Sequence, residues 1–116
     1  MTVEFPELAR LLEHDQDKVQ RVVWEFYRSA IKDLHRLEQA ATTHDWQMVR
    51  NLAHRIHVSC LHVGERDAAE AAATLAVIPG EFFADAYQRR GPKIVESLDR
   101  AEKFVGRRIS ARLSAG

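Results

Sequence analysis

Apolar residues recur every three or four positions along one segment, and this period constrains the fold more than any other feature of the sequence. Side chains at that spacing share one face of an α-helix. The residues on this face are Val19, Val22, Val23, Phe26, Ala30, Leu34, Leu37 and Ala41. Asp15 and Asp17 are candidate N-caps. The pattern predicts a helix of about 25 residues, a rod of roughly 37 Å that buries one face.

Helical signals also cover most of the remaining chain, and no segment alternates apolar and polar residues as a half-buried strand would. The other predicted helices span residues 5–13, 45–63, 67–78 and 81–113. Thr42 and Asp45 form a capping-box-like start for the helix over 45–63, and Gly64 is its expected stop. Pro79-Gly80 would end the helix over 67–78 near Ile78.

The last predicted helix is expected to break at Gly91-Pro92, where Pro92 suits the first position of a new helix. Its inward residues would be Ile94, Val95, Leu98, Ala101, Phe104, Val105 and Ile109. Amphipathic helices with short connections favour an antiparallel arrangement. The predicted fold class is therefore all-α: one domain over residues 1–116, an antiparallel four-helix bundle with a short extra N-terminal helix.

Composition limits the functions that such a domain can have. The 116 residues are 46% hydrophobic, and 17 basic and 17 acidic residues give a formal net charge of zero. This balance argues against a nucleic-acid partner and a polybasic membrane surface. No apolar run approaches the roughly 20 residues that span a bilayer. The single cysteine, Cys60, excludes an internal disulfide and fits a reducing compartment. We expect a cytoplasmic protein without membrane insertion.

The segment over residues 45–63 carries the candidate chemistry. At about 100° per residue, His54 points away from the apolar face of this helix. Arg50, His57, Val58 and Leu61 fall within about 60° of His54. The predicted core face consists of Val49, Leu52, Ala53, Ile56, Cys60 and Val63. An exposed imidazole beside two exposed apolar side chains suits a surface that docks a partner.

Ala53-His54-Arg55-Ile56, followed by Ser59 and Gly64, resembles the phospho-acceptor motif of histidine-containing phosphotransfer (HPt) domains, which reads roughly A-H-x-L-K-G-S. The resemblance covers about residues 15–78. It implies a phosphoryl carrier in a two-component phosphorelay, with His54 as the acceptor. The partner would be the receiver domain of a response regulator or hybrid sensor kinase.

The resemblance also implies that the partner, and not this chain, supplies most of the catalysis. The chain has no phosphate-binding G-x-x-x-x-G-K-[ST] loop and no carboxylate cluster beside His54 to hold Mg²⁺. We therefore expect no cofactor or metal on this chain, Mg²⁺ on the receiver only, and no enzymatic activity of its own. Arg50 and His57 would stabilise the added negative charge. The expected partner contacts are Val58, Leu61, Asn51 and Gln47.

Two positions depart from the family motif. The usual lysine is His57, and the glycine that follows it is Val58. A histidine carries the charge of the lysine only when it is protonated. Val58 adds a β-branched side chain one turn after His54. These changes either alter docking or abolish phosphotransfer, and in the second case the chain would be a degenerate HPt-like module that binds a receiver or kinase without being phosphorylated.

A metal-binding bundle is a third hypothesis. His54 and His57 stand three residues apart and could both contact Zn²⁺. Two ligands are too few for such a site, and Cys60 lies on the opposite face of the helix.

Overall fold

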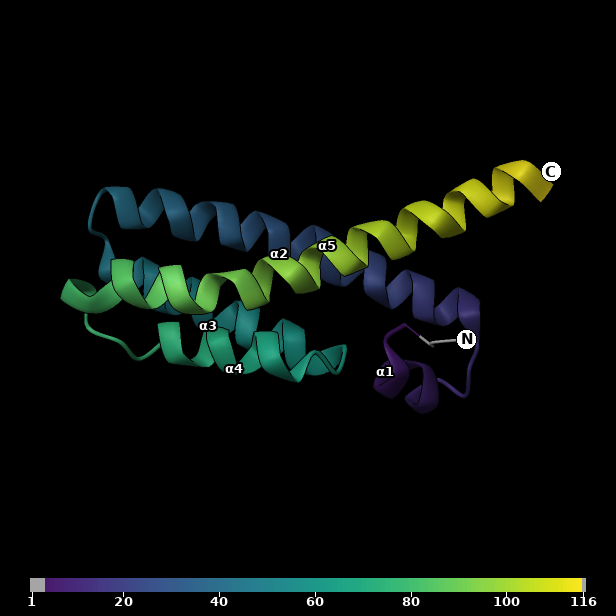
Figure 1. The fold of residues 1–116 in the computed structure, drawn as a ribbon, viewed down its shortest axis with the longest axis horizontal. Helices are drawn as coiled ribbons and strands as arrows, with labels where there is room; N and C mark the ends of the chain where they lie inside the picture. The colour runs from purple at the N-terminus through teal and green to yellow at the C-terminus, as the bar shows by residue number, and fades with distance from the viewer. Residues whose placement is uncertain (1–3, 116) are drawn as a thin grey trace.

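The computed structural model describes residues 4–115, with side chains through Arg107, and this part of the chain contains helices but no strand (Figure 1). The all-α prediction is therefore confirmed. The elements are α1 (Pro6–Leu11), α2 (Gln16–Thr42), α3 (Trp46–His62), α4 (Arg66–Leu75), the 3-10 turn η1 (Gly80–Phe82) and α5 (Phe83–Ala115). None of the described helices is both long enough and apolar enough to cross a membrane.

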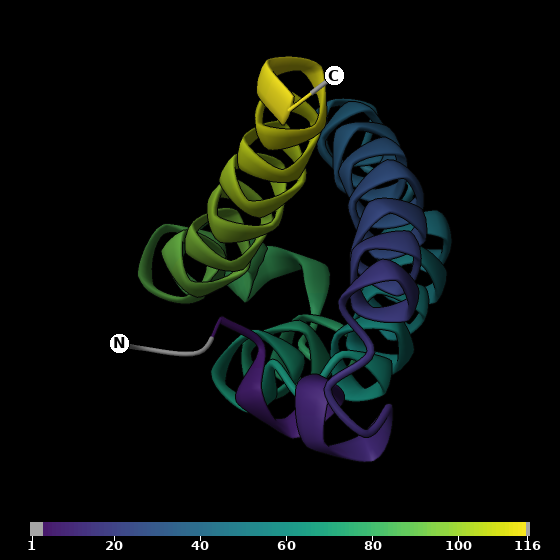
Figure 2. The ribbon, with the colours of Figure 1, turned by 90° about the vertical axis from the view of Figure 1, so that its right-hand side faces the viewer.

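The four longer helices pack as neighbours in chain order. Helix α2 contacts α3, α3 contacts α4, α4 contacts α5, and α5 returns to α2 (Figures 1 and 2). The largest side chains sealed between them are Leu37, Leu52, Ile56, Leu75 and Ile94. The molecule is elongated, 51 × 24 × 20 Å. Helices α3 and α4 lie side by side, so the outer face of α3 is bordered by α2 on one side and by α4 on the other.

The short helix α1 lies beside the start of α2 (Figure 1). Glu7 accepts a hydrogen bond from Arg66 of α4 at 2.8 Å. The ring of Phe5 meets the edge of Phe104 of α5 with centroids 5.7 Å apart. These two contacts attach the N-terminal segment to α4 and α5, and α1 is the extra helix that the sequence predicted.

The ends of α2 and α3 follow the sequence signals closely, with one correction. Asp15 caps α2 by accepting the Lys18 N–H, and Asp45 caps α3 by accepting the Met48 N–H. The capping-box prediction for Thr42 is wrong, because Thr42 is the last residue of α2 and its hydroxyl donates back to the Gln39 carbonyl.

Gly64 ends α3 as predicted. Its φ of +74° is a left-handed conformation that glycine adopts without a Cβ penalty. The reversal lets the Glu65 N–H donate to the Cys60 carbonyl at 2.9 Å, which satisfies one of the free carbonyls at the helix end.

The predicted break at Gly91-Pro92 is wrong, because α5 continues through both residues. Pro92 is exposed, and because it has no N–H the helix lacks the backbone hydrogen bond that this position would donate. Gly91 is buried, and a Cβ there would lie 3.1 Å from the Tyr87 ring. The buried face that resumes at Ile94 and Leu98 holds the helix together across the proline.

Two smaller predictions for the second half of the chain also need correction. Helix α4 begins at Arg66 and ends at Leu75, three residues before the predicted end at Ile78. Pro79 restricts only Ile78, so it does not explain the earlier end. Val95, predicted to face inward, is 52% exposed. The side chain of Ile109, predicted on the same inward face, lies outside the described side chains.

Candidate functional site

Helix α3 separates its residues onto two faces as the periodicity predicted. All six residues of the expected core face, from Val49 to Val63, are buried, and His54 is exposed. Cys60 is fully buried on this inner face, and its burial, reinforced by the charge of Glu65, raises the pKa of its thiol to about 12. The imidazole of His54 is therefore held on the outside of a helix whose other side is fixed in the core.

The exposed residues around His54 form a continuous outer surface, which we call the α3 ridge: Gln47, Asn51, His54, Val58 and Leu61. Val58 is 38% exposed and Leu61 51% exposed, so both present apolar surface to solvent. The Gln47 amide nitrogen donates to the Asn51 side-chain oxygen at 3.0 Å. Arg50, which is half-buried, donates to the Gln47 side-chain oxygen at 3.5 Å. The ridge thus combines an exposed imidazole ring, amide groups and apolar side chains.

His57 lies at the border between the ridge and α4. Its Nδ1 is 2.8 Å from the backbone carbonyl of Ala69, and since a carbonyl can only accept, Nδ1 carries the hydrogen. The ring of His57 is half-buried and tilted by 41° to that of His54, with centroids 6.0 Å apart. The structure therefore brings these two predicted site residues together and fixes which nitrogen of His57 remains for another contact.

On the other side of the ridge, Arg55 connects α3 to α2. Its Nε donates to Asp33 at 3.1 Å, and Arg36 lies 4.0 Å from the same carboxylate. Asp33 is almost completely buried, with a side chain 3% exposed. We did not predict this residue from sequence, although a signal exists: Asp33 is in phase with the apolar stripe at Phe26, Ala30 and Leu37.

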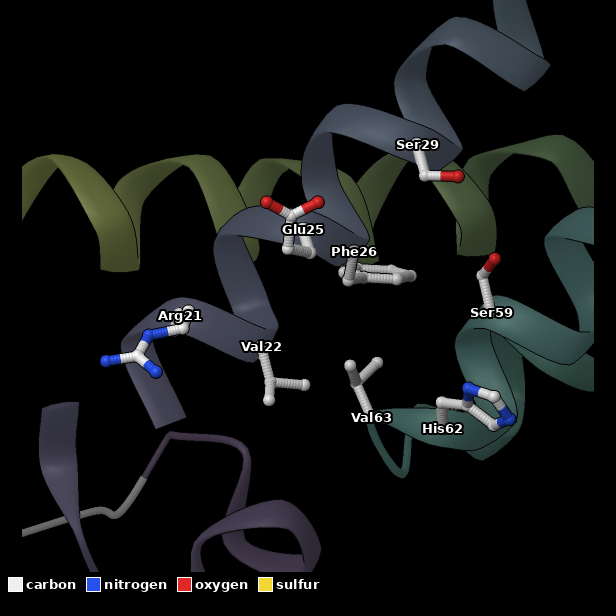
Figure 3. Close-up of a pocket in the computed structure, with 8 residues that line it drawn as sticks. All are labelled: Arg21, Val22, Glu25, Phe26, Ser29, Ser59, His62 and Val63. Atoms are coloured by element: carbon white, nitrogen blue, oxygen red, sulfur yellow. The ribbon is translucent and has the colours of Figure 1, made fainter. Parts of the chain in front are cut away.

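Ser59, part of the motif, does not face His54. Together with His62 and Val63 it lines a pocket of about 360 Å³ against α2 (Figure 3). In Figure 3, Val22 and Val63 point toward each other, with the Phe26 ring beside them. The pocket has an apolar centre between the two helices, and Ser59 belongs to this seam rather than to the ridge.

Among the described residues, no group of three or more His, Cys, Asp or Glu side chains is placed to hold a metal ion. His54 and His57 are neighbours, but the Nδ1 of His57 is already engaged with Ala69. The pair therefore offers at most two nitrogens to a metal, fewer than a protein zinc site requires.

Comparison with protein-family models, with curated proteins and with solved structures finds no match to this chain.

Proposed function

We propose that this chain is an HPt-type phosphoryl carrier of a two-component phosphorelay, with His54 as the residue that accepts and donates the phosphoryl group. The observation that carries the proposal is the exposure of the His54 ring on a helix whose opposite face is sealed in the core. The cyclic packing of α2 to α5 supports an antiparallel four-helix bundle, with α1 as an added helix. We further propose that residues 1–116 act as one cytoplasmic module.

The chemistry is a transfer between an acyl phosphate and an imidazole. The unprotonated nitrogen of His54 attacks phosphorus, an N–P bond forms, and the bond from phosphorus to the aspartyl oxygen of the receiver breaks. The aspartate leaves as a carboxylate. In the reverse step this carboxylate attacks phosphorus, the N–P bond breaks, and the aspartyl phosphate and the free imidazole are regenerated. Mg²⁺ on the receiver would neutralise the phosphoryl oxygens during the transfer. Exposure of His54 is required, because the incoming group must align behind its nitrogen.

His57 and Arg50 would assist by stabilising the new charge. With Nδ1 donating to the Ala69 carbonyl, the Nε2 of His57 can donate to a phosphoryl oxygen on His54 only when the imidazole is protonated, because Nε2 of the neutral ring carries no hydrogen. Arg50 lies one helical turn before His54 and contributes a permanent positive charge. The receiver would rest on Val58 and Leu61, with Gln47 and Asn51 providing polar contacts.

A second candidate function is a module that binds a receiver or kinase without being phosphorylated. Two neighbours of His54, Val58 and His57, favour it. Val58 presents a branched side chain where the family has glycine, and it is 38% exposed. His57 is tied to Ala69, whereas the family's lysine would be flexible. Both features favour a docking surface over a mobile phosphate-binding group.

The deciding experiment incubates the protein with a panel of ³²P-phosphorylated receiver domains and Mg²⁺. We expect label on His54 that is lost in acid and stable in base, as for an N–P bond. His54→Gln should abolish labelling and retain receiver binding, whereas His62→Gln should leave both unchanged. Binding without labelling of the wild type would establish the docking-only module. A base-labile adduct, or label on another residue, would overturn the assignment.

A further inference from the structure

A depression of about 590 Å³ lies between α2 and α3 beside the ridge, and its lining is rich in positive charge. Arg28, Lys32 and Arg36 line it from α2, and Arg55 lines it from α3. We call these four residues the cationic groove. Glu25 and Asp33 are the acidic residues of the lining, so the formal excess is two positive charges in a chain whose net charge is zero.

Asp33 holds two of the three arginines of the groove, Arg36 and Arg55. Arg28 instead pairs with Glu25 at 3.5 Å, and both of these side chains are exposed. The Asp33 carboxylate lies at the buried base of the depression, where it accepts from the Nε of Arg55 at 3.1 Å. Arg55 keeps 61% of its side chain exposed, and Arg36 keeps 47%. Because Arg55 uses only Nε in this bond, its terminal nitrogens can donate to a ligand from a fixed position.

The spacing of the cations indicates an extended anionic ligand. Arg28, Lys32 and Arg36 follow one another in steps of four residues, which places them about 6 Å apart in a row of about 12 Å. A single phosphate ion would contact only part of this row. A series of carboxylates on a protein surface matches its length.

The position of the groove indicates which protein surface that is. Arg55 directly follows His54, so the groove borders the α3 ridge. The phospho-acceptor of the proposed partner is an aspartate, and carboxylates are the side chains that hold Mg²⁺ beside it. We therefore expect an acidic surface on the partner where it meets the α3 ridge.

Resting on the proposed function, we infer that the cationic groove docks a row of acidic side chains of the receiver, beside the transfer site. The attraction acts mainly on encounter and orientation, so it depends strongly on salt. The phosphoryl transfer itself remains the work of His54 and the receiver.

The test measures binding of unphosphorylated, Mg²⁺-loaded receiver domains from the panel to three proteins. These are the wild type, the double variant Arg28→Glu/Lys32→Glu, and the control Arg89→Glu/Lys93→Glu, which makes the same charge change at the same spacing on α5. Neither groove substitution removes a partner of Asp33. Arg28→Gln/Lys32→Gln replaces the groove variant if circular dichroism shows that it is unfolded.

We expect the groove variant to bind about tenfold more weakly at 50 mM NaCl, with the difference shrinking below about threefold at 500 mM. The control should remain within about twofold of wild type. Equal losses in both variants, or wild-type binding that is independent of salt, would overturn the inference.

The two proposals fail in different ways. If receivers bind and label wild type and groove variant alike, only the role of the groove is wrong. If no receiver binds, the proposed function and this inference are both wrong. Tighter binding of tripolyphosphate or a short DNA duplex than of any receiver would also overturn the inference, by assigning the groove to another polyanion.

Discussion

At the scale of single residues, the exposure of His54 and the burial of its opposite face follow from helical periodicity alone. Asp33 was also accessible to such reasoning, because it is in phase with an apolar stripe. The hydrogen bond between His57 and Ala69 could not be predicted in this way. Its acceptor is a backbone carbonyl on another helix, and every residue has a backbone carbonyl, whatever its side chain. The sequence therefore identifies the position of the candidate nucleophile but not the orientation of its neighbour.

Replacing His57 tests whether that orientation serves phosphotransfer. We expect His57→Ala to lower the rate of labelling of His54 by about tenfold, because a charge-assisted hydrogen bond to the phosphoryl group is lost. His57→Lys should restore most of the rate, since a lysine can reach the same oxygens. Rapid-quench assays with a phosphorylated receiver measure both. His62→Ala is the control on the same helix, and an undiminished rate in His57→Ala would contradict the assigned role.

At the scale of elements, the caps decide where α2 and α3 begin, and the sequence marks them well. Asp15 and Asp45 accept the expected backbone N–H groups. Predictions failed where tertiary packing overrode a local signal. The buried residues on both sides of Pro92 carry α5 through a proline that local rules treat as a helix start. N-cap residues in the sequence thus predict where α2 and α3 begin, whereas a proline in the sequence does not predict whether α5 is interrupted.

Gly64 offers a test of one helix end. An alanine there would hold a left-handed φ of +74°, and its Cβ would lie 2.7 Å from the Cβ of Glu7. We expect Gly64→Ala to lower the free energy of unfolding by about 2 kcal/mol and to loosen α1. Urea denaturation measures the loss. Gly106→Ala, where nothing lies within 4 Å of the new methyl, should instead stabilise by about 0.5 kcal/mol. Equal effects of the two substitutions would refute this explanation.

At the scale of the whole molecule, the fold class could be predicted because nearly every segment has a period of three to four residues. The order of packing could not, since periodicity shows which face is buried and not which helix covers it. The contacts of α3 with both α2 and α4 come only from the structure. The cationic groove is a product of that packing, because Arg55 of α3 is at least 19 positions away in the sequence from every lining residue on α2.

The buried thiol of Cys60 and the half-buried phenol of Tyr87 make the stability of the molecule sensitive to alkaline pH. Burial raises the pKa of Cys60 to about 12, and burial with the neighbouring Glu38 also raises the pKa of Tyr87. The native state keeps protons that the unfolded chain releases from about pH 9 upward, so the free energy of unfolding falls as pH rises. We expect a slope of roughly 1 kcal/mol per pH unit between pH 9 and 11.

Urea titrations at constant ionic strength measure this slope. Cys60→Ala and Tyr87→Phe should each make it shallower, whatever their effect on stability at pH 7. A free energy of unfolding that stays level or increases over this range would show that neither group holds its proton more tightly in the native state.

Two neighbours of His54 on α3 are each hydrogen-bonded to an adjoining helix. Arg55 contacts Asp33 of α2, and His57 contacts Ala69 of α4. A small shift of either helix would therefore alter the immediate environment of the imidazole without touching it. The two contacts thus place the sequence neighbours of an exposed side chain under the control of two different helix interfaces.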